Sequence, residues 1–212
     1  KGDTGDAYTV LQISSQGSKS GTGFSKKNIT GCKNPTYHMA GTGSNLVWKD
    51  DIADPFGGSN TALYFDGKGY LDFADSDDWD LGSKMTIEAW IYVTGEPSDG
   101  WAPIVTSGDF TGSSTAGWSF TTWNTADICR LGFLVNNTWN NANSQEFLYH
   151  QWNHCAVTRD GAWYQIFLNG VPQHTFYHAT NPVTGTSLFV GRTHYLSEKI
   201  FMGYMDNLRI SK

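Results

Sequence analysis

Alternation of apolar and polar residues in one segment is the sequence feature that most restricts the fold. Every odd position of residues 85–93 is apolar. Successive side chains of a β-strand point to opposite faces, so we expect Ile87, Ala89 and Ile91 to face a core and Glu88 to lie on the other face. The segment is therefore predicted to be a half-buried strand.

Two pairs of turn residues predict hairpins later in the chain. Asp160-Gly161 and Asn169-Gly170 are dipeptides that favour tight turns between antiparallel strands. The strands expected around them are 152–158, 163–168 and 171–176, with further strands at 10–13, 188–191 and 201–210. Residues 15–45 are rich in small polar residues and are expected to form long surface loops, and helix is expected only as a short piece near 77–81.

The composition agrees with a β-sandwich and excludes several classes of function. The chain has 212 residues, of which 16% are charged against a usual value of about 25%, and it contains 24 glycines. Its net charge of −6, without a run of Lys or Arg, argues against nucleic-acid binding. Its apolar stretches are too short to span a bilayer. We therefore predict an all-β, antiparallel β-sandwich that neither binds nucleic acid nor inserts into a membrane.

The first seven residues are expected to lie outside the folded domain. Glycines three positions apart in residues 1–7 are typical of the end of a collagen-like Gly-X-Y segment, and a flexible linker is the other interpretation. A collagen-like segment would make the full-length protein a homotrimer, because a triple helix needs three strands. Residues 8–212 are predicted to form a single domain. Cys32 and Cys129 are candidates for a disulfide, and Cys155 is expected to be a small buried residue.

Six motifs, in the same order along the chain, resemble those of laminin-G-like domains of the concanavalin A-like lectin/glucanase superfamily. They are ALYFDGKGYL at 62–71, TIEAWI at 86–91, WNHCAVTRDG at 152–161, FLNG at 167–170, LFVGR at 188–192 and FMGYMDNLRI at 201–210. The resemblance implies a jelly-roll β-sandwich. Lectins, adhesion modules and enzyme appendages share this fold, so the fold alone does not fix the function.

One further segment resembles versions of this domain in tail-fibre and structural proteins of phages. It is the acidic run at residues 75–80. The resemblance implies a receptor-binding or adhesion domain that is extracellular or lies on the virion surface. Its partner would be a glycan or a cell-surface receptor.

The closing segment 201–210 suggests a metal site. Alternation places Asp206 on the apolar face, where a carboxylate needs a partner. Asp66, at the end of the first clear strand, is the natural second carboxylate. Related domains often carry a structural calcium between such strands, so the resemblance implies Ca²⁺ held by Asp66 and Asp206. The alternative is that Asp206 only accepts backbone N–H bonds.

A region between Trp101 and Tyr149 combines tryptophans with asparagines and is the predicted ligand-binding region. Aromatic faces stack on the C–H faces of sugars, and amides bind hydroxyl groups. The candidate ligand-binding residues are Trp118, Trp123, Asn136, Trp139 and Asn140. Trp139, which has polar residues on both sides, is expected to be exposed. The alternative for any single tryptophan is that it fills the core or braces a loop.

The sequence lacks the pair of glutamates on one strand that glucanases of the superfamily use for catalysis. Glucanases of the superfamily carry two glutamates in an E-x-D-x-x-E run, whereas Glu88 stands alone here. We expect His154 to be a packed, hydrogen-bonded strand residue. The predicted function is non-catalytic, lectin-like binding of a carbohydrate or receptor. The alternatives are a structural domain that packs against its own copies in a fibre, and a glycoside hydrolase.

Overall fold

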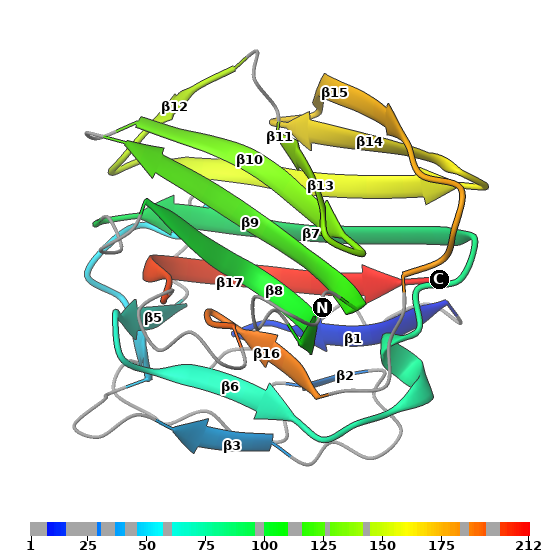
Figure 1. Cartoon of the computed structure of the whole chain (residues 1–212). Helices are drawn as coiled ribbons and strands as arrows, with labels where there is room; N and C mark the ends of the chain where they lie inside the picture. The colour runs from blue at the N-terminus through cyan, green and yellow to red at the C-terminus, as the bar shows by residue number, and fades with distance from the viewer. Residues whose placement is uncertain are drawn as a thin grey trace.

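The fold consists of two antiparallel β-sheets packed face to face. Figure 1 shows the strands of the front sheet running diagonally across those of the rear sheet. The computed structural model describes residues 8–15, 29–30, 37–40, 46–56, 61–95, 100–109, 116–125, 128–141, 145–182, 187–193 and 200–212. The predicted all-β sandwich is confirmed.

The rear sheet has nine strands, and its central strand β7 carries the alternating segment that the sequence predicts. Its main path runs β15-β14-β13-β7-β17-β1-β2, with β5 paired to β17 and β4 paired to β5. The bounds are β1 Thr9–Ile13, β2 Ile29–Thr30, β4 Val47–Lys49, β5 Ala62–Asp66, β7 Lys84–Val93, β13 Trp152–Asp160, β14 Trp163–Leu168, β15 Val171–Tyr177 and β17 Met202–Ser211.

The front sheet has eight strands and follows the order β11-β10-β9-β8-β16-β6-β3, with β12 paired to β10. The bounds are β3 Tyr37–Ala40, β6 Tyr70–Phe73, β8 Trp101–Asp109, β9 Ala116–Thr125, β10 Ile128–Val135, β11 Thr138–Asn141, β12 Phe147–Leu148 and β16 Leu188–Val190. A short 3-10 turn, η2 at Asp77–Trp79, lies where the sequence predicts a short piece of helix. Within the described residues, no helix is long and apolar enough to cross a membrane.

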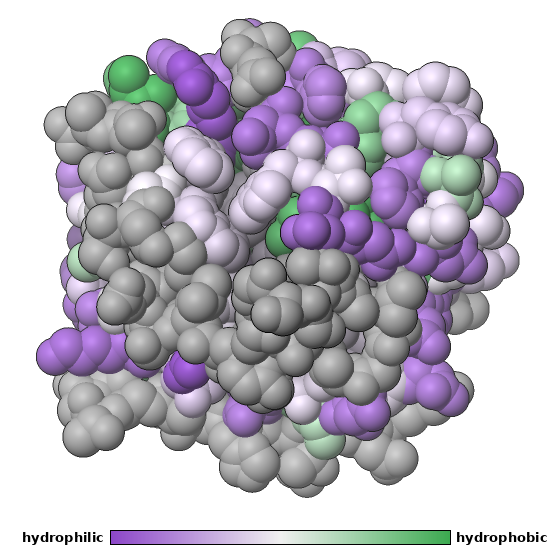
Figure 2. All heavy atoms as spheres, viewed as in Figure 1, coloured by the Kyte–Doolittle hydropathy of each residue, from purple (hydrophilic) through white to green (hydrophobic). Residues whose placement is uncertain are grey.

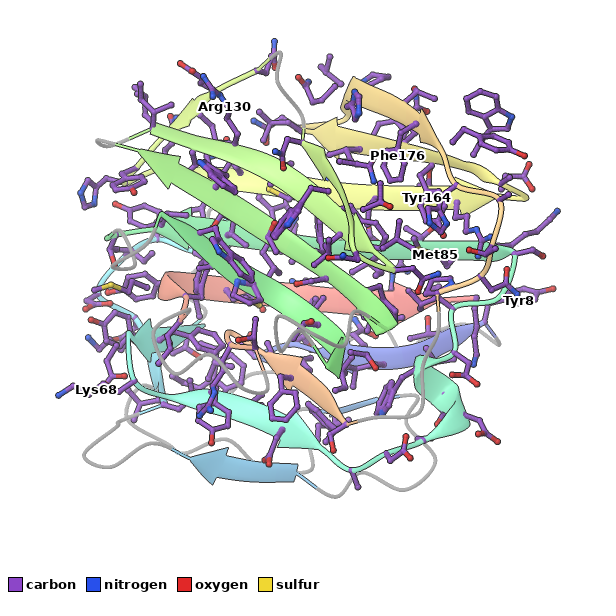
Figure 3. All side chains as sticks on the ribbon, viewed as in Figure 1. Tyr8, Lys68, Met85, Arg130, Tyr164 and Phe176 are labelled. Carbon is purple, nitrogen blue, oxygen red and sulfur yellow. The ribbon has the colours of Figure 1, made fainter. Side chains whose placement is uncertain are left out.

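The core lies between the sheets and follows the predicted alternation. Ile87, Ala89 and Ile91 of β7 are fully buried, whereas Glu88 lies on the outer face. Near the edge of the nine-stranded sheet, Tyr164 of β14 stacks on Phe176 of β15, with ring centroids 4.8 Å apart (Figure 3). Such ring pairs add specificity of packing to the burial of apolar area.

The hairpin turns are confirmed. β13 and β14 are joined at Gly161-Ala162, one residue past the predicted turn start. The turn between β14 and β15 uses Asn169 and Gly170, which have φ values of 50° and 77°. Two consecutive residues with positive φ suit a tight turn between right-twisted strands, and Asn and Gly tolerate this conformation best.

One sequence expectation changes in the N-terminal third, and two others are not tested. Residues 15–45 are not loop alone, because they contain strands β2 and β3. Cys32 and residues 1–7 lie outside the described residues, so the predicted disulfide and collagen-like segment do too. Cys155 is fully buried as expected, and burial raises the pKa of its thiol well above the ordinary value.

The prediction that Asp206 lies on the apolar face is wrong. The pairing of β17 with β7 is irregular just after Asp206, and Asn207 has a φ of 47°. This bulge reverses the alternation, so Met205 and Leu208 both belong to the core. Asp206, which pairs with Trp90, therefore points to the outer face of the nine-stranded sheet.

A chain segment nevertheless covers that outer face near Asp206. The Trp152 indole N–H donates to the carbonyl of Ala53 at 2.6 Å, and the ring of Phe56 meets that of Trp90 edge-on at 5.6 Å. Asp206 is consequently only 4% exposed. Burial of this carboxylate comes from the crossing segment and not from the sandwich core.

Candidate functional site

Three tryptophans meet on the outer face of the eight-stranded sheet. Trp101 of β8 pairs with Trp123 of β9, and Trp139 of β11 pairs with Leu134 of β10. Paired residues project to the same face of a sheet. The register of four neighbouring strands thus places Trp101, Trp123 and Trp139 together, and we call these three residues the tryptophan cluster.

The geometry of the tryptophan cluster leaves one ring presented to solvent. Trp139 packs edge-on against Trp101, with centroids 5.1 Å apart and planes at 80°, and against Trp123 at 6.0 Å and 90°. Trp101 is 8% exposed, whereas Trp139 is 39% exposed. Two rings therefore hold a third in a fixed orientation, which lowers the entropy lost when a ligand stacks on it.

Polar groups lie beside the tryptophan cluster on the same face. Asn141 pairs with Gly132, where the absence of a side chain makes room for the Asn141 amide and the Thr121 hydroxyl. A Cβ at this glycine would lie 2.8 Å from Asn141 Oδ1. Among the described residues, neither Asn141 Oδ1 nor Ser119 Oγ has a hydrogen-bond partner. Both oxygens are buried, whereas the Asn141 residue as a whole is only partly buried.

Hydrophilic residues surround this region of the surface. In Figure 2, pale residues of intermediate hydropathy lie over the upper front strands, with hydrophilic residues around them. Arg130, labelled in Figure 3, lies opposite Trp123 in the pairing of β10 with β9. Its guanidinium forms an ion pair with Glu146. The face thus combines an aromatic platform with groups that form hydrogen bonds.

The structure brings together two of the five predicted ligand-binding residues, Trp123 and Trp139. Trp101 and Asn141 join them and were missed. Asn141 lies two positions after Trp139, and the period of two along a strand is the signal that identifies it. Trp101 carries no such signal, because its place depends on the register of β8 against β9.

Trp118 is not part of this site, and its prediction as a ligand-binding residue is wrong. Its side chain is fully buried, its indole N–H donates to the carbonyl of Trp79 at 3.1 Å, and its ring stacks on Phe133 at 6.4 Å. Trp118 and Phe120 alternate with Ser119 and Thr121, which is the pattern of a strand that has one face toward the core. The alternation identifies Trp118 as a core residue.

The two predicted asparagines also lie apart from the tryptophan cluster. Asn136 forms the β10–β11 turn with a φ of 41°, and its amide donates to the carbonyl of Asn181 at 2.9 Å. Asn140 neighbours Trp139 in sequence, so it points to the opposite side of β11, and its amide donates to the carbonyl of Thr138 at 3.2 Å. Both amides act within the fold.

The structure does not bring Asp66 and Asp206 together. Asp66 pairs with Met202, four residues before Asp206 on β17, which separates the two aspartates by about 13 Å along the strand. Asp66 Oδ1 accepts N–H bonds from Lys68 and Gly69, both at 2.9 Å, and so closes the β5–β6 turn.

A different carboxylate, Asp54, lies near Asp206. Both aspartates are 4% exposed, and Asp206 Oδ1 accepts backbone N–H bonds from Asn207 at 2.8 Å and Ser15 at 3.4 Å. Burial, together with the negative charge of Asp54, raises the pKa of Asp206 from 3.8 to about 6. Within the described part of the chain, no three His, Cys, Asp or Glu side chains converge as a metal-binding group.

Glu88 is the centre of a charged network on the outer face of the nine-stranded sheet. His154 Nε2 donates to its Oε2 at 3.2 Å, and Arg209 Nε donates to its Oε1 at 2.7 Å. The His154 hydrogen bond and the Arg209 guanidinium hold the pKa of Glu88 below its ordinary value. The expectation of a packed, hydrogen-bonded His154 is confirmed. A general acid needs a raised pKa, so this network favours a fixed carboxylate over an acid catalyst.

Comparison with known proteins gives a family match and several similar folds. The model of the Laminin_G_3 family, described as the concanavalin A-like lectin/glucanases superfamily, matches residues 65–212. A search of curated protein sequences finds no significant match.

Among solved structures, the chain is similar to domain 4 of AbnA, an extracellular arabinanase from Geobacillus stearothermophilus, in complex with arabinotriose. The TM-score is 0.66 at 16% identity, over 97% of this chain and 92% of that one. The binding domain of botulinum neurotoxin DC, in complex with SialylT, gives 0.57 at 16% identity over 96% of this chain and 47% of that one. Trypanosoma rangeli sialidase gives 0.64 at 12% identity over 98% and 31%.

These similarities establish the fold and no more, because the identities are low. The chain spans about half of the neurotoxin domain and about a third of the sialidase. Binding domains and glycosidases occur side by side among the similar structures, so function must be argued from the site itself.

Proposed function

This chain belongs to the Laminin_G_3 family of the concanavalin A-like lectin/glucanases superfamily, and we propose that it binds carbohydrate without catalysis, at the tryptophan cluster. The observation that carries the proposal is the braced, partly exposed ring of Trp139, with the partly buried amide residue Asn141 beside it. A sugar offers both complementary surfaces, C–H groups for the ring and hydroxyl groups for the amide.

Several features support binding over hydrolysis. Retaining glycosidases place two carboxyl groups roughly 5 Å apart at the reacting bond. The described polar groups beside the tryptophan cluster are instead hydroxyls, an amide and the Arg130–Glu146 ion pair. Glu88, which stands alone in β7 without a second glutamate, is fixed by His154 and Arg209. These features support a domain that binds carbohydrate and does not hydrolyse it.

The setting is proposed from the similar structures and the sequence. The arabinanase whose domain is similar is extracellular and was solved with arabinotriose, and the neurotoxin binding domain was solved with SialylT. We propose that this chain likewise acts outside the cell on a glycan or a glycan-bearing receptor. A virion-surface fibre and a homotrimeric parent protein remain predictions from the phage-like acidic segment and residues 1–7.

Trp139→Ala is expected to weaken binding to the best glycan at least about tenfold, because an aromatic residue at the centre of a contact is a typical hot spot. The glycan is first identified by array screening of the purified chain, with calcium and with EDTA, and the affinity is then measured by titration calorimetry. The thermal midpoint should stay close to that of the unchanged protein, since Trp139 is partly exposed and outside the core.

The matched control is Trp163→Ala. Trp163 is a 58% exposed tryptophan on β14, paired with Tyr177 at the far edge of the nine-stranded sheet, and it also packs edge-on, at 5.2 Å. Its loss should leave glycan affinity unchanged. A blank array with folded protein would contradict the proposal, as would equal loss in both variants. Self-association that Trp139→Ala weakens would instead favour the fibre-packing alternative.

We also propose that a structural calcium binds at Asp206, with Asp54 as the second carboxylate in place of Asp66. Two carboxylates that are both 4% exposed lie near one another, and a divalent cation would neutralise them. Hard oxygen ligands of this kind suit Ca²⁺, and backbone carbonyls commonly complete its coordination.

A further inference from the structure

A cavity lies on the opposite side of the molecule from the tryptophan cluster. It has a volume of about 360 Å³ and opens on the outer face of the nine-stranded sheet, where β1, β7, β13 and β17 run side by side. Its walls are Gln12, Phe56, Glu88, Trp90, His154, Asn207 and Arg209. Ligand pockets occupy roughly 300–1,000 Å³, so this volume suits a small ligand.

A glutamine whose amide oxygen has no partner among the described residues lines this cavity. Gln12 is 5% exposed, and within the described residues its Oε1 has no hydrogen-bond partner. A buried acceptor without a partner is unfavourable, and most folds avoid it. Gln12 sits opposite Arg209 in the β1–β17 pairing, so its amide faces the charged network around Glu88. This is the independent observation that indicates a ligand.

The polar groups of the cavity are held in place before any ligand arrives. Glu88 is fixed by His154 and Arg209. Arg209 lines the cavity and has five N–H donors, and its contacts with Glu88 use Nε and one terminal nitrogen. Asn207 sits in the bulge with a φ of 47°, a conformation that turns its side chain out of the strand ladder and into the cavity wall.

An aromatic wall faces these polar groups. The ring of Trp90 meets Phe56 at 5.6 Å and His154 at 5.3 Å, so it is held from both sides. Trp90 is half-buried, which leaves part of its ring available to the cavity. The arrangement combines a fixed aromatic surface with fixed donors and acceptors, the same combination of groups that sugars match at the tryptophan cluster.

The charges indicate what kind of ligand fits. One ionised carboxylate and one guanidinium face the cavity and balance each other. The Glu88 carboxylate disfavours phosphates and carboxylates at the cavity, and the Arg209 guanidinium disfavours cations. Hydroxyl groups both donate and accept, so they match an acceptor such as Gln12 Oε1 and a donor such as Arg209 at once.

We propose that this cavity binds one neutral sugar unit, as a second carbohydrate site independent of the tryptophan cluster. With two sites on opposite faces, one domain would engage two glycan chains, or two branches of one glycan. Simultaneous binding would raise avidity without any new contact. This inference goes beyond the proposed function, and either site is able to exist without the other.

The test is a titration of the ¹⁵N-labelled whole chain, followed by NMR. The probes are L-arabinose, D-galactose, D-glucose and N-acetyl-D-glucosamine, added separately at millimolar concentrations, where a single sugar unit is expected to bind (Kd of about 1 mM). The Trp90 indole signal, assigned by its loss in Trp90→Phe, should shift saturably with at least one sugar. It should shift equally in Trp139→Ala, which removes the other site only.

Two variants keep the result interpretable. Gln12→Met preserves the size of the side chain and removes the unpartnered acceptor, so the thermal midpoint should not fall while affinity for the bound sugar drops about tenfold. Asn207→Gly suits the positive φ and removes a cavity-lining amide, with the same expected pattern. A thermal midpoint that falls in Gln12→Met would instead show that Gln12 serves folding.

The inference is overturned if no sugar of the panel shifts the Trp90 signal, or if Gln12→Met and Asn207→Gly bind as tightly as the unchanged protein. Failure of the proposed function looks different, because Trp139→Ala would then leave glycan affinity unchanged while the Trp90 signal still responds. The two sites are therefore tested separately within one set of spectra.

Discussion

Replacing Trp118 by alanine should lower the free energy of unfolding by about 3–5 kcal/mol, the usual cost of removing a large aromatic side chain from a packed core. Trp118 is fully buried, stacks on Phe133, and donates its indole N–H to the carbonyl of Trp79. The substitution leaves both a cavity and an unpaired carbonyl. Urea-induced unfolding, followed by fluorescence or circular dichroism, measures the change.

Two further variants show whether the loss of stability comes from the buried ring of Trp118. Trp118→Phe keeps much of the ring and should cost less than Trp118→Ala, whereas Trp139→Ala should change stability little because Trp139 lies outside the core. Any folded Trp118→Ala protein should still bind the glycan, since Trp118 does not reach the surface. Unchanged stability, or selective loss of binding from a fully folded variant, would restore Trp118 as a ligand-binding residue.

Asp206→Asn should make the calcium-free protein more stable at neutral pH, by up to about 3 kcal/mol. Burial raises the pKa of Asp206 from 3.8 to about 6, a difference that corresponds to about 3 kcal/mol between the two protonation states. The folded protein therefore keeps this proton up to about pH 6, whereas the unfolded chain releases it near 3.8. The contribution of Asp206 to stability is highest below pH 3.8 and falls as the pH rises to 6.

The measurement is the free energy of unfolding of both proteins in EDTA across this pH range. The difference between Asp206→Asn and the unchanged protein should grow from near zero at low pH to its full value above pH 6, because the other carboxylates cancel in the comparison. A constant difference would show that Asp206 titrates normally. Asp66→Asn is the control, since Asp66 Oδ1 accepts two backbone N–H bonds in the β5–β6 turn, and its replacement should not stabilise the protein at neutral pH.

The effect of added calcium on stability distinguishes a calcium site at Asp206 from a buried carboxylate that binds no metal. A cation that binds only the folded protein stabilises it by about 2.7 kcal/mol at a hundredfold excess over its Kd. At neutral pH the unchanged protein should gain stability on addition of calcium, and Asp206→Asn and Asp54→Asn should gain much less. A melting temperature indifferent to both EDTA and calcium would exclude the structural calcium while leaving the pH profile of Asp206 intact.

Much of the sandwich could be predicted from the sequence because its signals are local. Alternation in residues 85–93 identified which side of β7 faces the core, and Asp160-Gly161 and Asn169-Gly170 identified two hairpins. Such patterns reflect the fixed period of a strand and the few residues that tolerate tight turns. They need no knowledge of the rest of the chain.

The same local reasoning failed where one inserted residue changes the phase of a strand. Asp206 was placed on the core face because the alternation was extended through 201–210 without the bulge at Asn207. Asn adopts positive φ more readily than most other residues, but the neighbouring sequence does not show which Asn will do so. Because side chains repeat every two residues, a single bulge reverses the face of everything beyond it.

The sequence by itself determined the fold class, the core of β7, the hairpins and the exposure of Trp139. Only the tertiary structure decided that Trp101 and Asn141 join Trp139, that Asp54 replaces Asp66 beside Asp206, and that Gln12 meets the Glu88 network. These neighbours come from strands and segments far apart in the chain. Their meeting depends on strand order and register, which are fixed by packing of the whole sandwich and not by any local pattern.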